Sequence, residues 1–162
     1  MNSVNQCVRE YTVQLKKGEI QVAYKGILTF MNEFRTLLEN TYPSCSCSAV
    51  YPGYLDMTYF ACTPAQIKER KLKIAIVYLH EEAKFEIWLA ANNRAIQKEY
   101  MTRLLKKDTG NYTVAQAAPG VDAILISAAL MDPDFDQTDH LKKELGDLLL
   151  KFTDDVISIL EA

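Results

Sequence analysis

Polar side chains able to do chemistry occupy alternate positions in two segments with the pattern of strands, YLDMTYFAC and KFEIWLA. They are Asp56, Thr58, Glu86 and Trp88. Successive side chains of a strand point to opposite faces of the sheet, so placing Met57 and Phe85 in the core turns all four toward the other face. Carboxylates beside an indole suit a polar or cationic ligand that stacks on the ring. We therefore expect this shared face to be the binding surface, if the protein has one.

A helix is predicted directly after the second of these strands, and its first turn carries further polar residues. Asn92 or Asn93 can cap this helix. Asn93, Arg94 and Gln97 begin it, so these three are candidates to line one end of the surface. A structural alternative stays open. In that alternative a helix covers the face, and the two acids form ion pairs with Arg94 or Lys73.

Motifs of the commoner enzyme classes are absent. The chain has no GxGxxG, GxxxxGKS/T, GxSxG or HExxH, which argues against phosphate-cradling loops, α/β-hydrolase nucleophiles and zinc hydrolases. His80 lies in the turn HEEA between two predicted strands, where a solvent-exposed side chain is expected. A general base also needs an orienting partner within hydrogen-bond reach. The sequence therefore assigns no catalytic residue.

The cysteines and acids do not form a recognisable metal motif. Cys45 and Cys47 are separated by one residue and Cys62 stands alone, whereas structural zinc sites use paired ligands in both halves. The acids of DPDFD resemble the start of a calcium loop, but Gln137 stands in place of its glycine and Lys143 in place of its glutamate. We expect reduced thiols, no metal and no cofactor.

The elements that must position these residues follow from hydrophobic periodicity. Apolar residues at three- and four-residue spacing predict two N-terminal helices, and a stripe of large apolar residues predicts that the C-terminal helix belongs to the core. A short helix is expected between Pro64 and Lys71. The sequence thus predicts an α+β fold of order α-α-β-β-β-α-β-α, with helices packed on a mainly antiparallel sheet of about four strands. The main segments are 3–17, 20–38, 54–62, 72–79, 84–90, 93–107, 121–130 and 138–160.

Length and charge point to a single domain, 1–162, that binds neither nucleic acid nor a membrane. The 162 residues leave room for one core. The net charge of -3 disfavours a protein that depends on phosphate contacts, and no run approaches the ~20 apolar residues needed to cross a bilayer. The N-terminus lacks an apolar secretory segment, so a cytoplasmic location is expected. The expected partner is a small ligand or a protein, and a homodimer is possible.

Several longer motifs carry a family resemblance. The stretches PGYLDMTYF, KLKIAIVYLHEEAKFEIWLAANNRAIQKEY and GVDAIL, followed by DPDFD, resemble an uncharacterised family of small prokaryotic proteins, a domain of unknown function. The similarity runs from about Tyr11 to Phe152. It implies a stand-alone cytoplasmic protein of a bacterium or archaeon, and it transfers no catalytic residue.

Two hypotheses about function remain, and whether the protein is an enzyme stays open. The first is a non-enzymatic binding or interaction module that presents the polar and aromatic sheet face. The alternative is a degenerate metal-dependent nuclease-like enzyme, because the order of elements looks like the core of the restriction-endonuclease-like fold. Its acids would be Asp56 and Glu86 with a displaced Arg94, but Trp88 stands where that fold carries a lysine.

Overall fold

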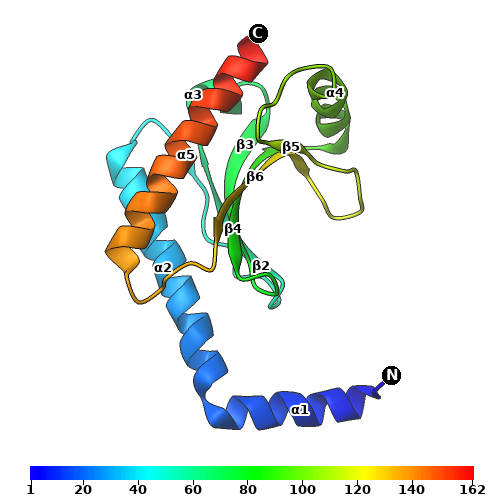
Figure 1. The fold of residues 1–162 in the computed structure, drawn as a ribbon, viewed down its shortest axis with the longest axis vertical. Coiled ribbons are helices and arrows are strands. Elements are labelled where there is room, and N and C mark those ends of the chain that lie inside the picture. Colours follow the sequence, from blue (N-terminus) through cyan, green and yellow to red (C-terminus); the bar gives the residue numbers. More distant parts are fainter.

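The computed structural model describes residues 1–162 and is built on one antiparallel sheet of six strands in the order β1-β2-β3-β4-β6-β5 (Figure 1). The helices are α1 (Val4–Lys17), α2 (Glu19–Thr41), α3 (Ala65–Lys68), α4 (Arg94–Leu104) and α5 (Thr138–Glu161). The strands are β1 (Ser46–Cys47), β2 (Met57–Thr63), β3 (Leu72–Leu79), β4 (Lys84–Ala91), β5 (Thr113–Val114) and β6 (Ala123–Met131).

The predicted α+β class and antiparallel pairing are confirmed, whereas the predicted number of strands is wrong. The sheet has six strands rather than about four, because β1 and β5 add short pairings at its two edges. Each of these strands is two residues long, too short to show an alternating pattern. The short helix α3 ends at Lys68, one turn before the predicted end.

The centre of the sheet is the hairpin of β3 and β4. The segment LKIAIVYL of β3 is rich in β-branched and aromatic residues and is apolar on both faces, as a central strand requires. Its register pairs Ile76 with Ile87 and Tyr78 with Phe85. Phe85, Ile87 and Leu89 are all fully buried, which confirms the predicted inward orientation of Phe85 and shows that the alternation continues along β4.

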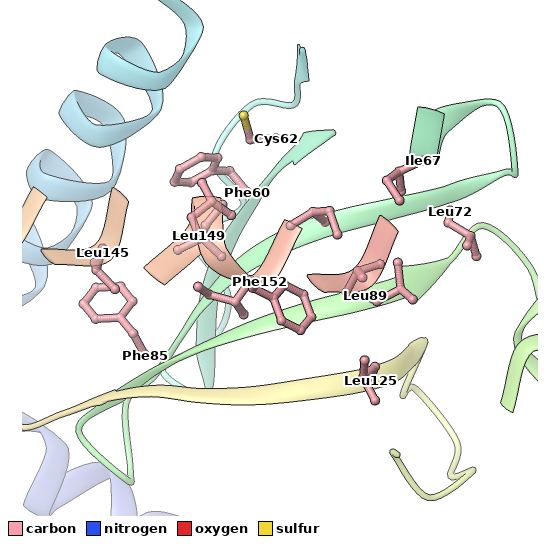
Figure 2. Close-up of a cluster of buried hydrophobic side chains, with 14 of the residues drawn as sticks. Phe60, Cys62, Ile67, Leu72, Phe85, Leu89, Leu125, Leu145, Leu149 and Phe152 are labelled. Carbon is pink, nitrogen blue, oxygen red and sulfur yellow. The ribbon is translucent and has the colours of Figure 1, made fainter. Parts of the chain in front are cut away.

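Helices α2 and α5 cover one face of the sheet, and the core lies between these helices and that face (Figure 1). Aromatic and aliphatic side chains of the strands meet side chains of α5 there, as Phe85 meets Leu145 in Figure 2. The expectation that the last helix belongs to the core is confirmed by its buried residues, which are Leu141, Leu145, Leu149, Phe152, Val156 and Leu160. Burial of a large apolar side chain contributes about 1.5–3 kcal/mol before entropic costs, so α5 is a main source of stability.

The predicted orientation of β2 is wrong. Thr58 pairs with Tyr78 and therefore lies on the core face, where it is completely buried. Met57 and Tyr59 point to the opposite face, and Asp56 lies before the strand begins. β2 begins only at Met57, because Leu55 before it adopts a left-handed conformation with φ of 65°. Its residues do alternate, but with the two faces opposite to those predicted.

The core face accepts the polar Thr58 because its hydroxyl is satisfied locally. The hydroxyl donates to the carbonyl oxygen of Pro52 at 2.7 Å. Its single proton is then committed, so the oxygen accepts from Nε2 of His80 at 2.8 Å. A buried threonine with both bonds made costs little, and β2 can therefore turn Phe60, the larger apolar residue, into the core.

Helix α1 leaves the body of the protein at the N-terminal end of α2 (Figure 1). It begins with a capping box between Ser3 and Gln6, and Gly18 ends it as a left-handed C-cap with φ of 81°. None of its residues is buried. Only the second half of α2 contacts the core, through Phe30 and the buried residues that follow it. None of the helices is long and apolar enough to span a bilayer.

Candidate functional site

The face of the sheet turned away from α2 and α5 carries a pocket of about 290 Å³. Helix α4 and the loop that leads into β6 lie on this side of the sheet (Figure 1). The floor of the pocket is formed by β2, β3 and β4, through side chains that include Tyr59, Val77 and Trp88. Its rim is formed by the start of α4 and by Gly120, Val121 and Asp122 of the loop.

The indole of Trp88 is held in place by Glu86, two residues earlier on the same face of β4. The indole Nε1–H donates to Oε1 of Glu86 at 3.0 Å. The other carboxylate oxygen of Glu86 lies 3.1 Å from Nζ of Lys84, whose ammonium also meets Glu82 at 2.8 Å. The hydrogen bonds to Glu82 and then to Glu86 raise the pKa of Lys84. Glu86 is only 8% exposed, so its partners compensate the cost of burying a charge.

The start of α4 is fixed to the pocket rim by side chains predicted from the sequence. Asn93 caps the helix by accepting from the backbone N–H of Ile96 at 3.0 Å. The buried amide of Gln97 donates to the carbonyl oxygens of Val121 and Ala123 at 2.9 Å and 3.0 Å. This amide ties the loop to the helix and gives the pocket a fixed rim.

Arg94 is the one charged residue of the pocket lining without a charged partner. Lys73 forms an ion pair with Asp122 at 2.9 Å across the pocket, which balances those two charges. Nη1 of Arg94 donates to Oε1 of Gln97 at 2.9 Å and to the carbonyl of Val121 at 2.6 Å. These two bonds use both Nη1 hydrogens, so the Nε and Nη2 donors remain free to bind an acceptor. The pocket lining therefore has a net charge of +1.

The structure brings together four of the seven candidates named from the sequence. Trp88, Asn93, Arg94 and Gln97 line one pocket. Glu86 accepts the hydrogen bond of the indole but does not line the pocket. Asp56 and Thr58 lie elsewhere, so the prediction that all the polar strand residues share a face is wrong for β2.

The ion-pair partner considered for Glu86 was also wrong. Glu86 pairs with Lys84 on its own strand rather than with Arg94 or Lys73. Lys73 lines the pocket, a position that the sequence did not predict for it. The pairing of β3 with β4 sets Lys73 opposite Ala90, which lies on the same face of β4 as Trp88. Asp122 and Val121 come from an irregular loop, and no periodic pattern of the sequence pointed to them.

His80 is more enclosed than its position in a turn suggested. Its ring donates to Thr58 and packs edge-on against Tyr78, with ring centroids 5.0 Å apart. Burial lowers the pKa of His80, and the nearby Asp56 carboxylate opposes this shift. The pKa of Asp56 is itself lowered, chiefly by the backbone N–H of Tyr54, which donates to its carboxylate at 2.9 Å. These contacts of His80 hold the turn between β3 and β4 against β2.

Three of the four cysteines gather at the β1 edge of the sheet. Cys47 faces Cys62 across the strand pair, with the Sγ atoms 3.4 Å apart. All four cysteines are free thiols. Burial raises the pKa of both Cys62 and Cys45, so neither is an activated nucleophile. No group of three or more histidine, cysteine or acidic side chains is arranged to hold a metal ion.

Comparisons with known proteins agree with the motif resemblance. No curated protein and no solved structure matches the chain significantly. One family model, described as Domain of unknown function (DUF7000), matches residues 4–160 and so spans every helix and strand except the last residue of α5. The chain therefore belongs to the DUF7000 family, a family of unknown function.

Proposed function

We propose that the protein is a binding module whose open-face pocket takes a small molecule with a flat apolar part and an anionic end. The observation that carries this proposal is that one pocket is lined both by the fixed indole of Trp88 and by Arg94, whose guanidinium has no acidic partner and keeps its Nε and Nη2 donors free. Arginine binds carboxylates and phosphates through paired N–H donors, and an indole offers a flat surface for stacking. A pocket of about 290 Å³ lies at the lower end of the range for small-molecule sites.

The charge of the lining favours an anionic ligand over the cationic one considered from the sequence. Both acids near the indole are already engaged, Glu86 by Lys84 and Asp122 by Lys73. A cation in the pocket would compete with these lysines and would also meet Arg94. An anion instead completes the hydrogen bonding of the guanidinium, and charge-assisted bonds of this kind contribute about 1.5–3 kcal/mol.

Nothing in the fold favours the nuclease alternative. That alternative needs Asp56 and Glu86 close together at one site. Asp56 instead lies before β2 begins, whereas Glu86 lies within β4 and already makes bonds to Trp88 and Lys84. For location we propose the cytoplasm of a prokaryotic cell, which agrees with four free cysteines and with the motif resemblance.

Trp88 is the only tryptophan of the chain, so its fluorescence reports on the pocket alone. Benzoate and phenyl phosphate are suitable first probes, and benzylamine is a control of similar shape and opposite charge. We expect saturable changes in emission with the two anions and weaker changes with the amine.

The matched variants are Arg94→Gln and Arg103→Gln, which change two arginines of the same helix. Arg103 lies outside the pocket and contacts Glu99 and the ring of Tyr100. Loss of a charge-assisted bond predicts that Arg94→Gln weakens anion binding at least about tenfold, while Arg103→Gln leaves it unchanged. Equal effects of the two substitutions, or a preference for the amine, would refute the proposal.

A further inference from the structure

The most conspicuous surface without a partner is the apolar stripe of α1. Its members recur with spacings of four, three and four residues, which places them on one side of the helix. They are Val4, Val8, Tyr11 and Leu15. Three of these side chains are widely exposed, Val4 by 79%, Val8 by 52% and Tyr11 by 56%. A contiguous apolar stripe on a helix that extends away from its own core marks an interaction surface.

The spacing of the stripe is the a and d pattern of a helix pair. With Val8 and Leu15 at a positions and Val4 and Tyr11 at d positions, about three turns of seam face one direction. Side chains at the flanking e and g positions lie next to the partner helix in such a pair. Here these positions hold only uncharged residues, which are Asn5, Cys7, Thr12 and Gln14.

The charges of α1 all lie away from the seam. Arg9, Glu10, Lys16 and Lys17 occupy b and c positions, so two identical copies of the helix can meet without like charges facing each other. A helix that lies on a lipid surface carries Trp, Phe or Leu on its apolar face and a polar face rich in Lys and Arg. The seam of α1 instead holds two valines, one tyrosine and one leucine, and its polar face includes the acidic Glu10. The pattern therefore suits a second copy of the same helix.

We propose that α1 pairs with α1 of a second copy of this chain in an antiparallel arrangement about a two-fold axis. Antiparallel pairing sets Tyr11 of one copy beside the smaller Val8 of the other, and Leu15 beside Val4. A parallel pair would instead set the two Tyr11 rings against each other. A two-fold interface uses the same patch on both copies, so the single stripe of α1 is enough to form it.

The attachment of α1 to the body agrees with this orientation. Each α1 continues through Gly18 into α2, so its C-terminal end carries the whole sheet domain (Figure 1). Antiparallel pairing puts the two bodies at opposite ends of the seam, separated by the ~21 Å length of the helix, whereas parallel pairing would crowd them together. The interface is small, so a dissociation constant of about micromolar order is expected.

The test is the mass of the full chain in solution, measured by sedimentation velocity from about 1 to 200 µM, a range that spans a weak dimer. The matched variants are Val8→Asp on the seam and Val13→Asp on the opposite side of the same helix. Their wild-type valines are 52% and 49% exposed, and neither contributes to the core, so both variants should fold.

Wild type and Val13→Asp should form dimers with the same affinity. Val8→Asp, which places two unpaired carboxylates in the seam, should raise the dissociation constant at least about 100-fold. A wild-type chain that stays monomeric throughout, or two variants with equal effects, would overturn the proposal. A monomer that binds phosphatidylserine vesicles only when Val8 is intact would assign the stripe to a membrane and would likewise overturn it.

Discussion

Replacing Glu86 tests whether its carboxylate holds the pocket together. The side chain accepts the indole N–H of Trp88 at 3.0 Å and lies 3.1 Å from Nζ of Lys84, and it is only 11% exposed. Glu86→Gln keeps the size of the side chain and one acceptor oxygen but removes the charge. Glu86→Ala removes both bonds and leaves a cavity behind the indole.

The expected cost follows from the two bonds. A bond to a charged group contributes about 1.5–3 kcal/mol and a neutral bond about 0.5–1.5 kcal/mol, so Glu86→Gln should lower the free energy of unfolding by about 1–2 kcal/mol. Glu86→Ala should cost about 3 kcal/mol, at the low end for a broken buried pair, because Lys84 still has Glu82 at 2.8 Å. For a chain of this length these losses correspond to a fall in Tm of about 2–4 °C per kcal/mol.

The control is Glu82→Gln, since Glu82 meets the same lysine but its side chain is 56% exposed. Exposed pairs contribute little, so this variant should lose less than about 0.5 kcal/mol. Urea unfolding followed by circular dichroism gives the free energies, and the emission of Trp88 reports the loss of its bond directly. If Glu86→Ala is as stable as Glu82→Gln and leaves the emission of Trp88 unchanged, Glu86 does not hold the indole in place, and the account of a fixed pocket floor is wrong.

Three further outcomes follow from the core, the turn and the thiols. Truncation after Asp136 removes α5 and its buried side chains, so we expect an insoluble or molten chain that binds ANS; a cooperative melt equal to that of the full chain would contradict this. Because burial holds the pKa of His80 below its usual 6.5, the unfolded chain binds more protons, and stability should fall as the pH drops below about 6.5. His80→Gln should flatten this slope, which melts across the pH range will measure. Toward a thiol reagent Cys7 should react fastest and Cys62, buried with a raised pKa, slowest, and elemental analysis should find no stoichiometric zinc.

Strand periodicity predicted the part of the site that comes from β4 and α4. The alternation of Phe85, Ile87 and Leu89 is unambiguous, because each inward residue is large and apolar. It therefore placed Glu86 and Trp88 correctly on the other face. The pocket residues in the first turn of α4 could be predicted as well, because this helix directly follows β4 in the chain.

The same reasoning failed on β2 because both of its faces offer plausible core residues. Met57 and Tyr59 compete with Phe60 for the core, and the pattern of alternation cannot rank them. A fact outside the pattern makes the observed orientation possible, namely the pair of hydrogen bonds that makes a buried Thr58 acceptable.

Helices α1 and α5 show the same limit at a larger scale. Both have an apolar stripe at helical spacing. In each case the stripe indicates that one face of the helix is covered, but it does not indicate what covers that face. The stripe of α5 finds its cover within the chain, because the loop after β6 returns the helix across the sheet (Figure 1). The stripe of α1 does not, since Gly18 turns the helix away from the body before it can reach the core. One left-handed glycine thus leaves α1 outside the core to which α2 contributes, and this is why our proposal for α1 concerns association rather than folding.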